Sequence, residues 1–327
     1  MVEEHKTNSK YEVLRILGEA LYDHQDVRKA SKNRVRSLIR QKLLDLGFIA
    51  EEKMEDEEKS KGNKYDDKKL ASLMKKALKS GKLNQEDHDF IMISLELADR
   101  ETEIEKDYEK KLKPLVEGEP IWKNWLKFVN GISTRNATRL LKWYGYCDRF
   151  DTISKLWAYT GLALVCPDCT EKITNDSGKQ ETIMVMVESK KEGAYCPKCG
   201  AKGIAPKRRK GINLPYNLKI KTDMIGVLGD NLMKANKGYK KIYDVYKERI
   251  LTRGCCNNPK CKGKPGHAHR MAIRKMVKIF LQHYWLQTRT IKKLEISQPW
   301  IIGKKRDNGG NHTNYIKPIF DKKPEIL

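Results

Sequence analysis

The sequence predicts a mainly α protein: a helical, coiled-coil N-terminal part, a helix-hairpin-helix core, an inserted zinc ribbon and a second, small zinc knuckle. Apolar residues recur at helical spacing over most of the 327 residues. Glycines and capping residues divide these stretches into helices, and two CxxC pairs bracket a segment of alternating apolar residues. We divide the chain into a helical region 1–118, a helix-hairpin-helix domain 119–165, a zinc ribbon 166–204, a basic helical region 205–294 and a basic extended tail 295–327.

The positive charge of the chain lies after residue 120. The net charge is +24; residues 1–120 hold 25 Lys or Arg and 27 Asp or Glu, whereas residues 121–327 hold 42 and 16. This asymmetry predicts a polyanionic partner. The sequence has no long apolar run and no signal-peptide pattern, which favours nucleic acid over a membrane and predicts a cytoplasmic, nucleoid-associated protein.

Three helices are predicted in the N-terminal part. An apolar stripe predicts a long helix over residues 11–48, and the highly charged residues 51–69 predict a solvated loop. A short helix over 68–79 should end at Gly81, and Asn84 should cap a helix that runs to about Leu115. In this last helix apolar residues at near-heptad spacing predict a coil within the chain or between two chains, and hence a homodimer, with a simple helical bundle as the alternative. These residues are Phe90, Ile93, Leu97, Ile104, Tyr108 and Leu115.

A helix-hairpin-helix is predicted around the turn Gly131-Ile132-Ser133. Glycine allows the backbone to approach a ligand, and the first N–H groups of the following helix lack internal partners, so the turn can seat a phosphate. Basic residues at i, i+4 and i+7 should line one face beside it. The expected DNA contacts are Gly131, Ser133, Thr134, Arg135, Arg139 and Lys142. The alternative is an ordinary helical hairpin with a solvated basic face.

The cysteines predict two zinc sites. Cys166 and Cys169, with Cys196 and Cys199, form two CxxC pairs around a β-like segment, the pattern of a zinc ribbon whose four thiolates leave no open position for catalysis. A second group, Cys256, Cys261, His267 and His269, predicts a small zinc knuckle in which Cys255 can replace Cys256. The histidines could instead cap the following helix.

Two further basic segments are predicted to contact DNA phosphates. The connector carries Lys207, Arg208, Arg209 and Lys210 in succession. A helix over about 270–294 pairs an apolar face with a basic stripe of Arg270, Arg274 and Lys278.

Three stretches of the sequence resemble a known family. They are the hairpin turn, the segment 266–274 and the block Arg149-Phe-Asp-Thr-Ile-Ser-Lys-Leu-Trp-Ala-Tyr-Thr-Gly-Leu162. Over roughly residues 90–294 the chain resembles the C-terminal domain of the bridge-RNA-guided transposases of insertion-sequence family one-ten. The resemblance implies a RuvC-like domain with four carboxylates, a dimerising coiled coil and a nucleophilic serine. Residues 1–120 show no strand-rich segment with spaced acidic residues, so we expect this chain to lack the carboxylate domain. The one Ser-Gly pair soon after the block is Ser177-Gly178.

Ser177 is therefore the candidate nucleophile that the resemblance leaves. Its neighbours Asn175 and Asp176 supply no clear activating base, so a polar ribbon turn is the interpretation that we favour. The sequence predicts a zinc-containing protein that binds double-stranded DNA and is related to the C-terminal half of a transposase. We expect it to be encoded by a mobile element, a virus or an archaeal or bacterial chromosome. The alternatives are an active transposase or recombinase with a serine nucleophile, and an RNA-binding protein.

Overall fold

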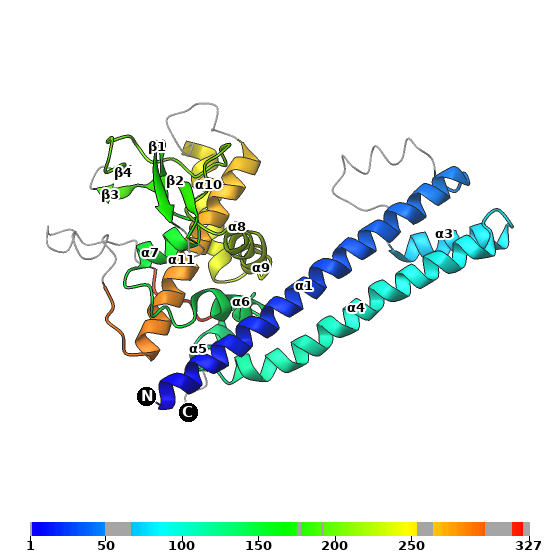
Figure 1. The fold of residues 1–327 in the computed structure, drawn as a ribbon, viewed down its shortest axis with the longest axis horizontal. Helices are drawn as coiled ribbons and strands as arrows, with labels where there is room; N and C mark the ends of the chain where they lie inside the picture. Colours follow the sequence, from blue (N-terminus) through cyan, green and yellow to red (C-terminus); the bar gives the residue numbers. More distant parts are fainter. Residues whose placement is uncertain are drawn as a thin grey trace. The chain divides into compact units, whose positions relative to one another are not determined.

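The protein is described from a computed structural model, which covers residues 2–49, 67–174, 178–190, 193–253, 264–297 and 316–322. The fold is mainly helical, as predicted, with 64% of the chain in helices and 9% in strands. It divides into two compact units, Met1–Pro114 and Leu115–Leu327, whose elements are labelled in Figure 1.

The first unit is built from the three predicted helices, the first of which begins at Val2, before the predicted start at residue 11. They are α1 (Val2–Asp45), α3 (Asp67–Lys79) and α4 (Gln85–Glu117). Gly81 follows α3 with a φ of +70°, and Asn84 Oδ1 accepts a hydrogen bond from the backbone N–H of Asp87 at 2.7 Å. The glycine end and the asparagine cap are therefore confirmed.

Figure 1 shows α1 and α4 running side by side, and polar contacts join them. Arg28 Nε lies 2.7 Å from Glu105 Oε2, and His24 Nδ1 lies 2.8 Å from Glu101 Oε2. In the part of α4 that belongs to the first unit, the buried side chains recur every seven residues, at Ile91, Ala98, Glu105 and Leu112. None of these four buried residues belongs to the predicted heptad.

Four of the six predicted heptad residues lie on another face of α4, whereas the Tyr108 ring stacks on His24 of α1 with ring centroids 5.4 Å apart. Phe90, Ile93, Leu97 and Ile104 are 61%, 57%, 55% and 37% exposed. Single exposed apolar residues are common on protein surfaces. A row of them along one face of a helix can be removed from water only when a partner packs against that face. Within the first unit these four residues therefore remain a solvent-facing stripe, which we call the α4 stripe.

Helices also form most of the second unit. They are α5 (Pro120–Asn124), the 3₁₀ turn η1 (Leu126–Phe128), α6 (Thr134–Tyr144), α7 (Ile153–Tyr159), α8 (Leu218–Lys221), the π-helical η2 (Thr222–Leu228), α9 (Gly229–Lys234), α10 (Tyr239–Arg253) and α11 (Pro265–Ile291). Gly238, between α9 and α10, has a φ of +43°.

Helix α11 supplies the core of the second unit. Its Phe280 and Trp285 are buried, and the Phe280 ring stacks on Trp125 with centroids 5.4 Å apart. Trp285 Nε1 donates to the carbonyl of Phe150 at 2.7 Å, and Tyr284 donates to that of Gly145 at 2.7 Å. These bonds fix the loop between α6 and α7 against α11, so this part of the chain forms one packed body.

The ribbon region contains two small antiparallel sheets. Strand β1 (Val165–Thr174) pairs with β2 (Gln180–Met186), in register from Thr174 opposite Gln180 to Thr170 opposite Met184. Strand β3 (Glu188–Lys190) pairs with β4 (Gly193–Tyr195). An irregularity between Val165 and Thr170 bends β1 where its two cysteines lie.

The described part of the C-terminal tail, residues 316–322, lies against the second unit. Trp125 Nε1 donates to the carbonyl of Ile319 at 3.0 Å, and Asp321 Oδ2 accepts from the backbone N–H of Asn130 at 2.8 Å. The tail was expected to be extended unless it docks on a partner. In these residues it has no helix or strand but is docked within its own chain.

Candidate metal centre and nucleic-acid interface

The four ribbon cysteines form a cluster that can hold a metal ion. The sulfur atoms of Cys166, Cys169, Cys196 and Cys199 all lie within 4.8 Å of one another, and those of Cys166 and Cys199 are 3.5 Å apart. Four thiolates on a tetrahedral zinc ion at about 2.3 Å would be about 3.8 Å apart. The spacing therefore fits such an ion with little rearrangement.

Backbone N–H groups support the cluster. Those of Cys169 and Asp168 lie 3.2 and 3.4 Å from Cys166 Sγ, and that of Lys198 lies 3.4 Å from Cys196 Sγ. Burial opposes ionisation of the Cys166 thiol, but the N–H groups of Cys169 and Asp168 lower its pKa to about 7. One thiolate is thus stabilised by the fold itself.

The Cys169 and Cys199 thiols cannot ionise as easily, because their pKa values are raised. The Cys169 thiol is hydrogen-bonded to Cys199 and faces Cys166, and these contacts together with burial raise its pKa to about 12. Like charges at this spacing repel strongly, so a divalent cation is needed to bring all four sulfurs to the thiolate form. The donor set is all sulfur, which suits a structural metal and leaves no position for a reacting water.

The predicted knuckle lies largely outside the described residues, since Cys255, Cys256 and Cys261 fall there. Its two histidines are at the start of α11, and His269 Nδ1 is 2.7 Å from the Tyr243 hydroxyl. Among the residues that the structure describes, the ribbon cysteines are the one group found that could hold a metal. Ser177 is also outside the described residues.

The hairpin turn is packed on one side by helix α9. Gly131 has a φ of +89°, and a Cβ at this position would lie 2.7 Å from the carbonyl oxygen of Asn231. The Asn130 N–H is occupied by Asp321, and Ser133 caps α6 by accepting from the Asn136 N–H at 3.4 Å. Glycine at 131 is thus required by backbone conformation and by internal packing, whether or not a phosphate binds.

Arg139 does not lie on the exposed basic face on which helical spacing places it. It is only 7% exposed; its Nη1 donates to Asn136 Oδ1 at 3.3 Å, and its Nε lies 3.7 Å from Asp223 Oδ1. The segment of η2 that carries Asp223 lies over this part of α6. Ser133 is exposed and Thr134, Arg135 and Lys142 are half-buried, so they remain the accessible members of the predicted hairpin site.

The three basic residues of α11 also differ from one another. Arg274 donates to the carbonyls of Leu162 and Ala163 at 2.7 and 3.2 Å, and burial lowers its pKa. Lys278 lies 4.4 Å from the Trp157 ring centroid, and burial, followed by repulsion from Arg274, lowers its pKa to about 8. Arg270 alone of the three is exposed. Arg274 and Lys278 thus hold the 157–163 segment against α11.

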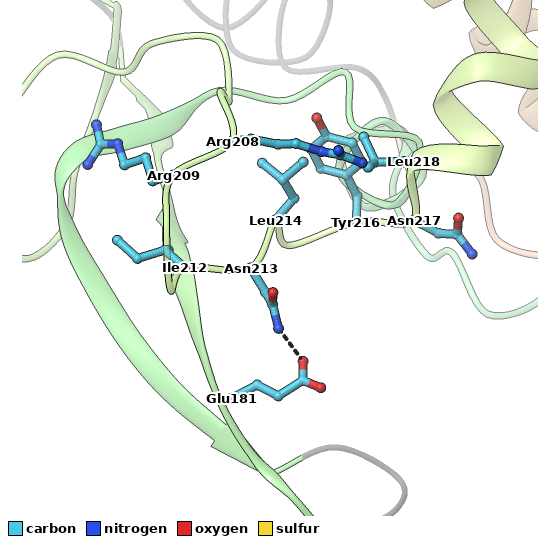
Figure 2. A pocket seen from close by; sticks show the side chains of 9 residues that line it. All are labelled: Glu181, Arg208, Arg209, Ile212, Asn213, Leu214, Tyr216, Asn217 and Leu218. Carbon is cyan, nitrogen blue, oxygen red and sulfur yellow. Dashed lines mark hydrogen bonds between the residues drawn. The ribbon is translucent and has the colours of Figure 1, made fainter.

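The connector, by contrast, presents its charges to solvent. Lys207, Arg208, Arg209 and Lys210 are all exposed. Arg209 and Ile212 form an antiparallel bridge around Lys210 and Gly211, whose φ is +75°. This basic turn, residues 207–212, borders an open groove of about 550 Å³ that also includes Asn213 and Tyr216 (Figure 2). Sequence reasoning found the basic residues but missed the groove, because a long-range pairing of Asn213 with Ile183 of β2 places the loop 208–218 beside Glu181.

Comparison of the chain with protein-family models, with curated proteins and with solved structures finds no match. No helix in the described part of the chain is long and apolar enough to cross a membrane.

Proposed function

We propose that the chain binds double-stranded DNA mainly through the phosphate backbone, as a zinc-containing protein related to the C-terminal half of a transposase. The observation that carries the proposal is the exposed basic turn 207–212, which a bridge between Arg209 and Ile212 keeps folded. The turn belongs to the part of the chain that contains 42 Lys or Arg against 16 Asp or Glu. Neutralisation of phosphates by such side chains releases counterions and supplies affinity without sequence specificity.

The proposed interface combines the basic turn with the accessible hairpin residues. Ser133 and Thr134 lie at the N-terminus of α6, where the helix dipole favours an anion, and Arg135 lies one residue further along the helix. Arg270 adds an exposed charge on α11. Arg139 is left out of the interface because its guanidinium is buried beside Asp223.

Zinc is the metal proposed for the four-cysteine cluster, because an all-thiolate tetrahedral set is typical of structural zinc. A second zinc ion is proposed at Cys256, Cys261, His267 and His269. A histidine that binds a metal through Nε2 usually donates its Nδ1–H to an acceptor. The Tyr243 hydroxyl, 2.7 Å from His269 Nδ1, can accept that bond.

The α4 stripe is proposed to pair with a second copy of the chain. Phe90, Ile93, Leu97 and Ile104 follow the three-and-four spacing with which helices pack as coiled coils. All four are exposed within the first unit, so a partner helix would bury them together. A dimer would also double the basic surface offered to one DNA molecule.

The test of DNA binding compares two double variants with the native chain. Arg208→Ala with Arg209→Ala removes two exposed charges from the basic turn, whereas Lys106→Ala with Lys110→Ala removes two exposed charges from α4. Binding to a labelled duplex is measured over a range of salt concentrations. We expect the first variant to bind about tenfold more weakly, with a log–log salt slope shallower by about 0.9 for each phosphate that it no longer neutralises. The second variant should bind as the native chain does.

Native protein that binds duplex DNA without salt dependence, or not at all, would contradict the proposal. Cleavage or strand joining of supercoiled DNA in the presence of magnesium would favour the rival enzyme instead, and loss of that activity in a Ser177→Ala variant would identify the nucleophile. Tighter binding to RNA of the same sequence would favour the RNA-binding alternative.

A further inference from the structure

The groove beside the basic turn has a lining more varied than phosphate binding requires. Arg208 and Arg209 supply positive charge, Leu214 and Tyr216 supply apolar and aromatic surface, and Asn213 and Glu181 supply polar atoms (Figure 2). Its volume of about 550 Å³ falls in the range of sites that bind small molecules.

The fold holds the charged side of the groove in place. The backbone N–H of Asn213 donates to the carbonyl of Thr182 at 2.8 Å, and Asn213 forms a parallel bridge with Ile183. These contacts attach the end of the basic turn to β2. The two arginines are therefore presented from a fixed loop, which lowers the entropy lost when they bind an anion.

The aromatic side of the groove is also built in. Gly161 has a φ of +71°, and a Cβ there would lie 2.5 Å from Tyr216 Cδ2, so the tyrosine ring packs directly against the glycine backbone. Lys221 Nζ donates to the Tyr216 hydroxyl at 3.0 Å. The ring is thus supported from two elements and cannot easily turn away from the groove.

A polar pair forms another part of the lining. Asn213 Nδ2 donates to Glu181 Oε2 at 3.0 Å, as the dashed line in Figure 2 marks. This bond fixes which way the amide faces, so that its carbonyl oxygen and second N–H have defined directions. Side-chain amides and carboxylates in such positions pair with the hydrogen-bonding edges of bases.

We propose that this groove binds one unpaired nucleotide of a DNA strand, with its phosphate at Arg208 and its base against Leu214 and Tyr216. Asn213 and Glu181 face the edge of that base. This inference rests on the proposed DNA binding and deepens it. A base inside a duplex is stacked on both faces, so it can enter such a groove only after leaving the helix or from a single-stranded segment.

The test uses two labelled DNA probes that differ in one position: a fully paired duplex, and the same duplex with one extra, unpaired adenine. Native protein should bind the bulged duplex at least about fivefold more tightly, the lower end of what stacking on an aromatic residue contributes. Tyr216→Ala should lose this preference and retain its affinity for the paired duplex, whereas Tyr216→Phe should keep the preference.

Two controls keep the test decisive. Thermal melting and zinc content establish that each variant is folded, and Asn213→Ala, at an exposed position, tests the groove if Tyr216→Ala does not fold. Loss of the amide that faces the edge of the base should lower the preference for the bulge. The substitution changes no charge, so paired-duplex affinity should stay within about twofold.

Equal affinity of the native chain for the two probes, with duplex binding intact, would overturn the inference and leave the proposed function standing. Failure to bind either probe would overturn both. A third outcome is that free deoxyadenosine monophosphate displaces the bulged duplex at concentrations near the Kd of that duplex. The groove would then be a site for mononucleotides, which would also overturn the inference.

Discussion

Arg139 Nε lies 3.7 Å from Asp223 Oδ1, and the other oxygen of this carboxylate accepts a hydrogen bond from Trp143 Nε1 at 2.8 Å. Asp223 thus joins η2 to two residues of α6, and the arginine is 7% exposed. The pair stabilises the packing of these helices and withdraws the most central basic residue of α6 from solvent.

We therefore expect Arg139→Ala to affect stability more than DNA affinity. Removal of one partner leaves a largely buried carboxylate without its positive charge, which costs about 3 kcal/mol in similar buried pairs. Denaturant unfolding followed by tryptophan fluorescence measures this loss. Arg135→Ala, on the same helix and half-buried, is the matched control and should change the free energy of unfolding by under about 1 kcal/mol.

Removal of ribbon thiols should change the metal content by one ion. We expect the native chain to contain two zinc ions, and Cys199→Ser to contain one, because the serine oxygen is a poor replacement for a thiolate ligand. Elemental analysis of purified protein measures the content. Cys147→Ala is the control: this cysteine is buried outside the cluster, burial raises its pKa to about 12, and its removal should leave both ions in place.

The second zinc ion is tested by the same measurement. Cys261→Ser should also leave one ion per chain, and the ion that remains should be lost when Cys199→Ser is added. One zinc ion in the native chain that disappears in Cys199→Ser alone would exclude the knuckle and keep the ribbon site.

The α4 stripe gives a prediction about assembly. Ile93→Gln with Leu97→Gln should convert a dimer to a monomer in sedimentation equilibrium, since both side chains are more than half exposed in the single chain and the substitutions replace apolar contacts across the proposed seam. Helical content should be unchanged. Val245→Gln, an exposed apolar residue on α10, is the control. A native chain that is monomeric at all concentrations would show the stripe to have another role.

The sequence predicted the helices because their ends carry local signals. Asn84 caps α4, and Gly81 and Gly238 interrupt helices with positive φ values, so neither signal depends on distant parts of the chain. The ribbon cysteines were predictable for a similar reason, because each CxxC pair is a local turn around one ion. Local chemistry was sufficient for these features.

Burial of particular basic residues could not be predicted in the same way. Helical spacing places Arg139 and Arg274 on faces of their helices, but it does not reveal which distant segment covers that face. Asp223 lies beside the first, and the carbonyls of Leu162 and Ala163 accept from the second. The groove was missed because the bridge between Ile183 and Asn213 is a long-range pairing.

Buried His283 should make the second unit sensitive to acid. Its Nε2–H donates to the carbonyl of Ile316 at 2.7 Å, so its Nδ1 must accept the hydrogen bond from the Tyr239 hydroxyl at 2.6 Å. This pattern requires the neutral ring. Burial lowers the pKa of His283 to about 4, against the opposing effect of the Ile316 carbonyl, whereas an unfolded histidine titrates near about 6.5.

Between these two pKa values the unfolded chain binds more protons at this residue than the folded chain does. The stability of the second unit should therefore fall as the pH is lowered from about 6.5 to about 4, by up to roughly 3 kcal/mol.

All six tryptophans of the sequence lie after residue 120, so denaturant unfolding followed by their fluorescence reports on this unit. His283→Gln, whose amide can donate to Ile316, should flatten the pH dependence in this window whatever its absolute stability. His88→Gln, on α4, should leave it unchanged. If the two variants show the same slope as the native chain, the acid sensitivity arises from groups other than His283.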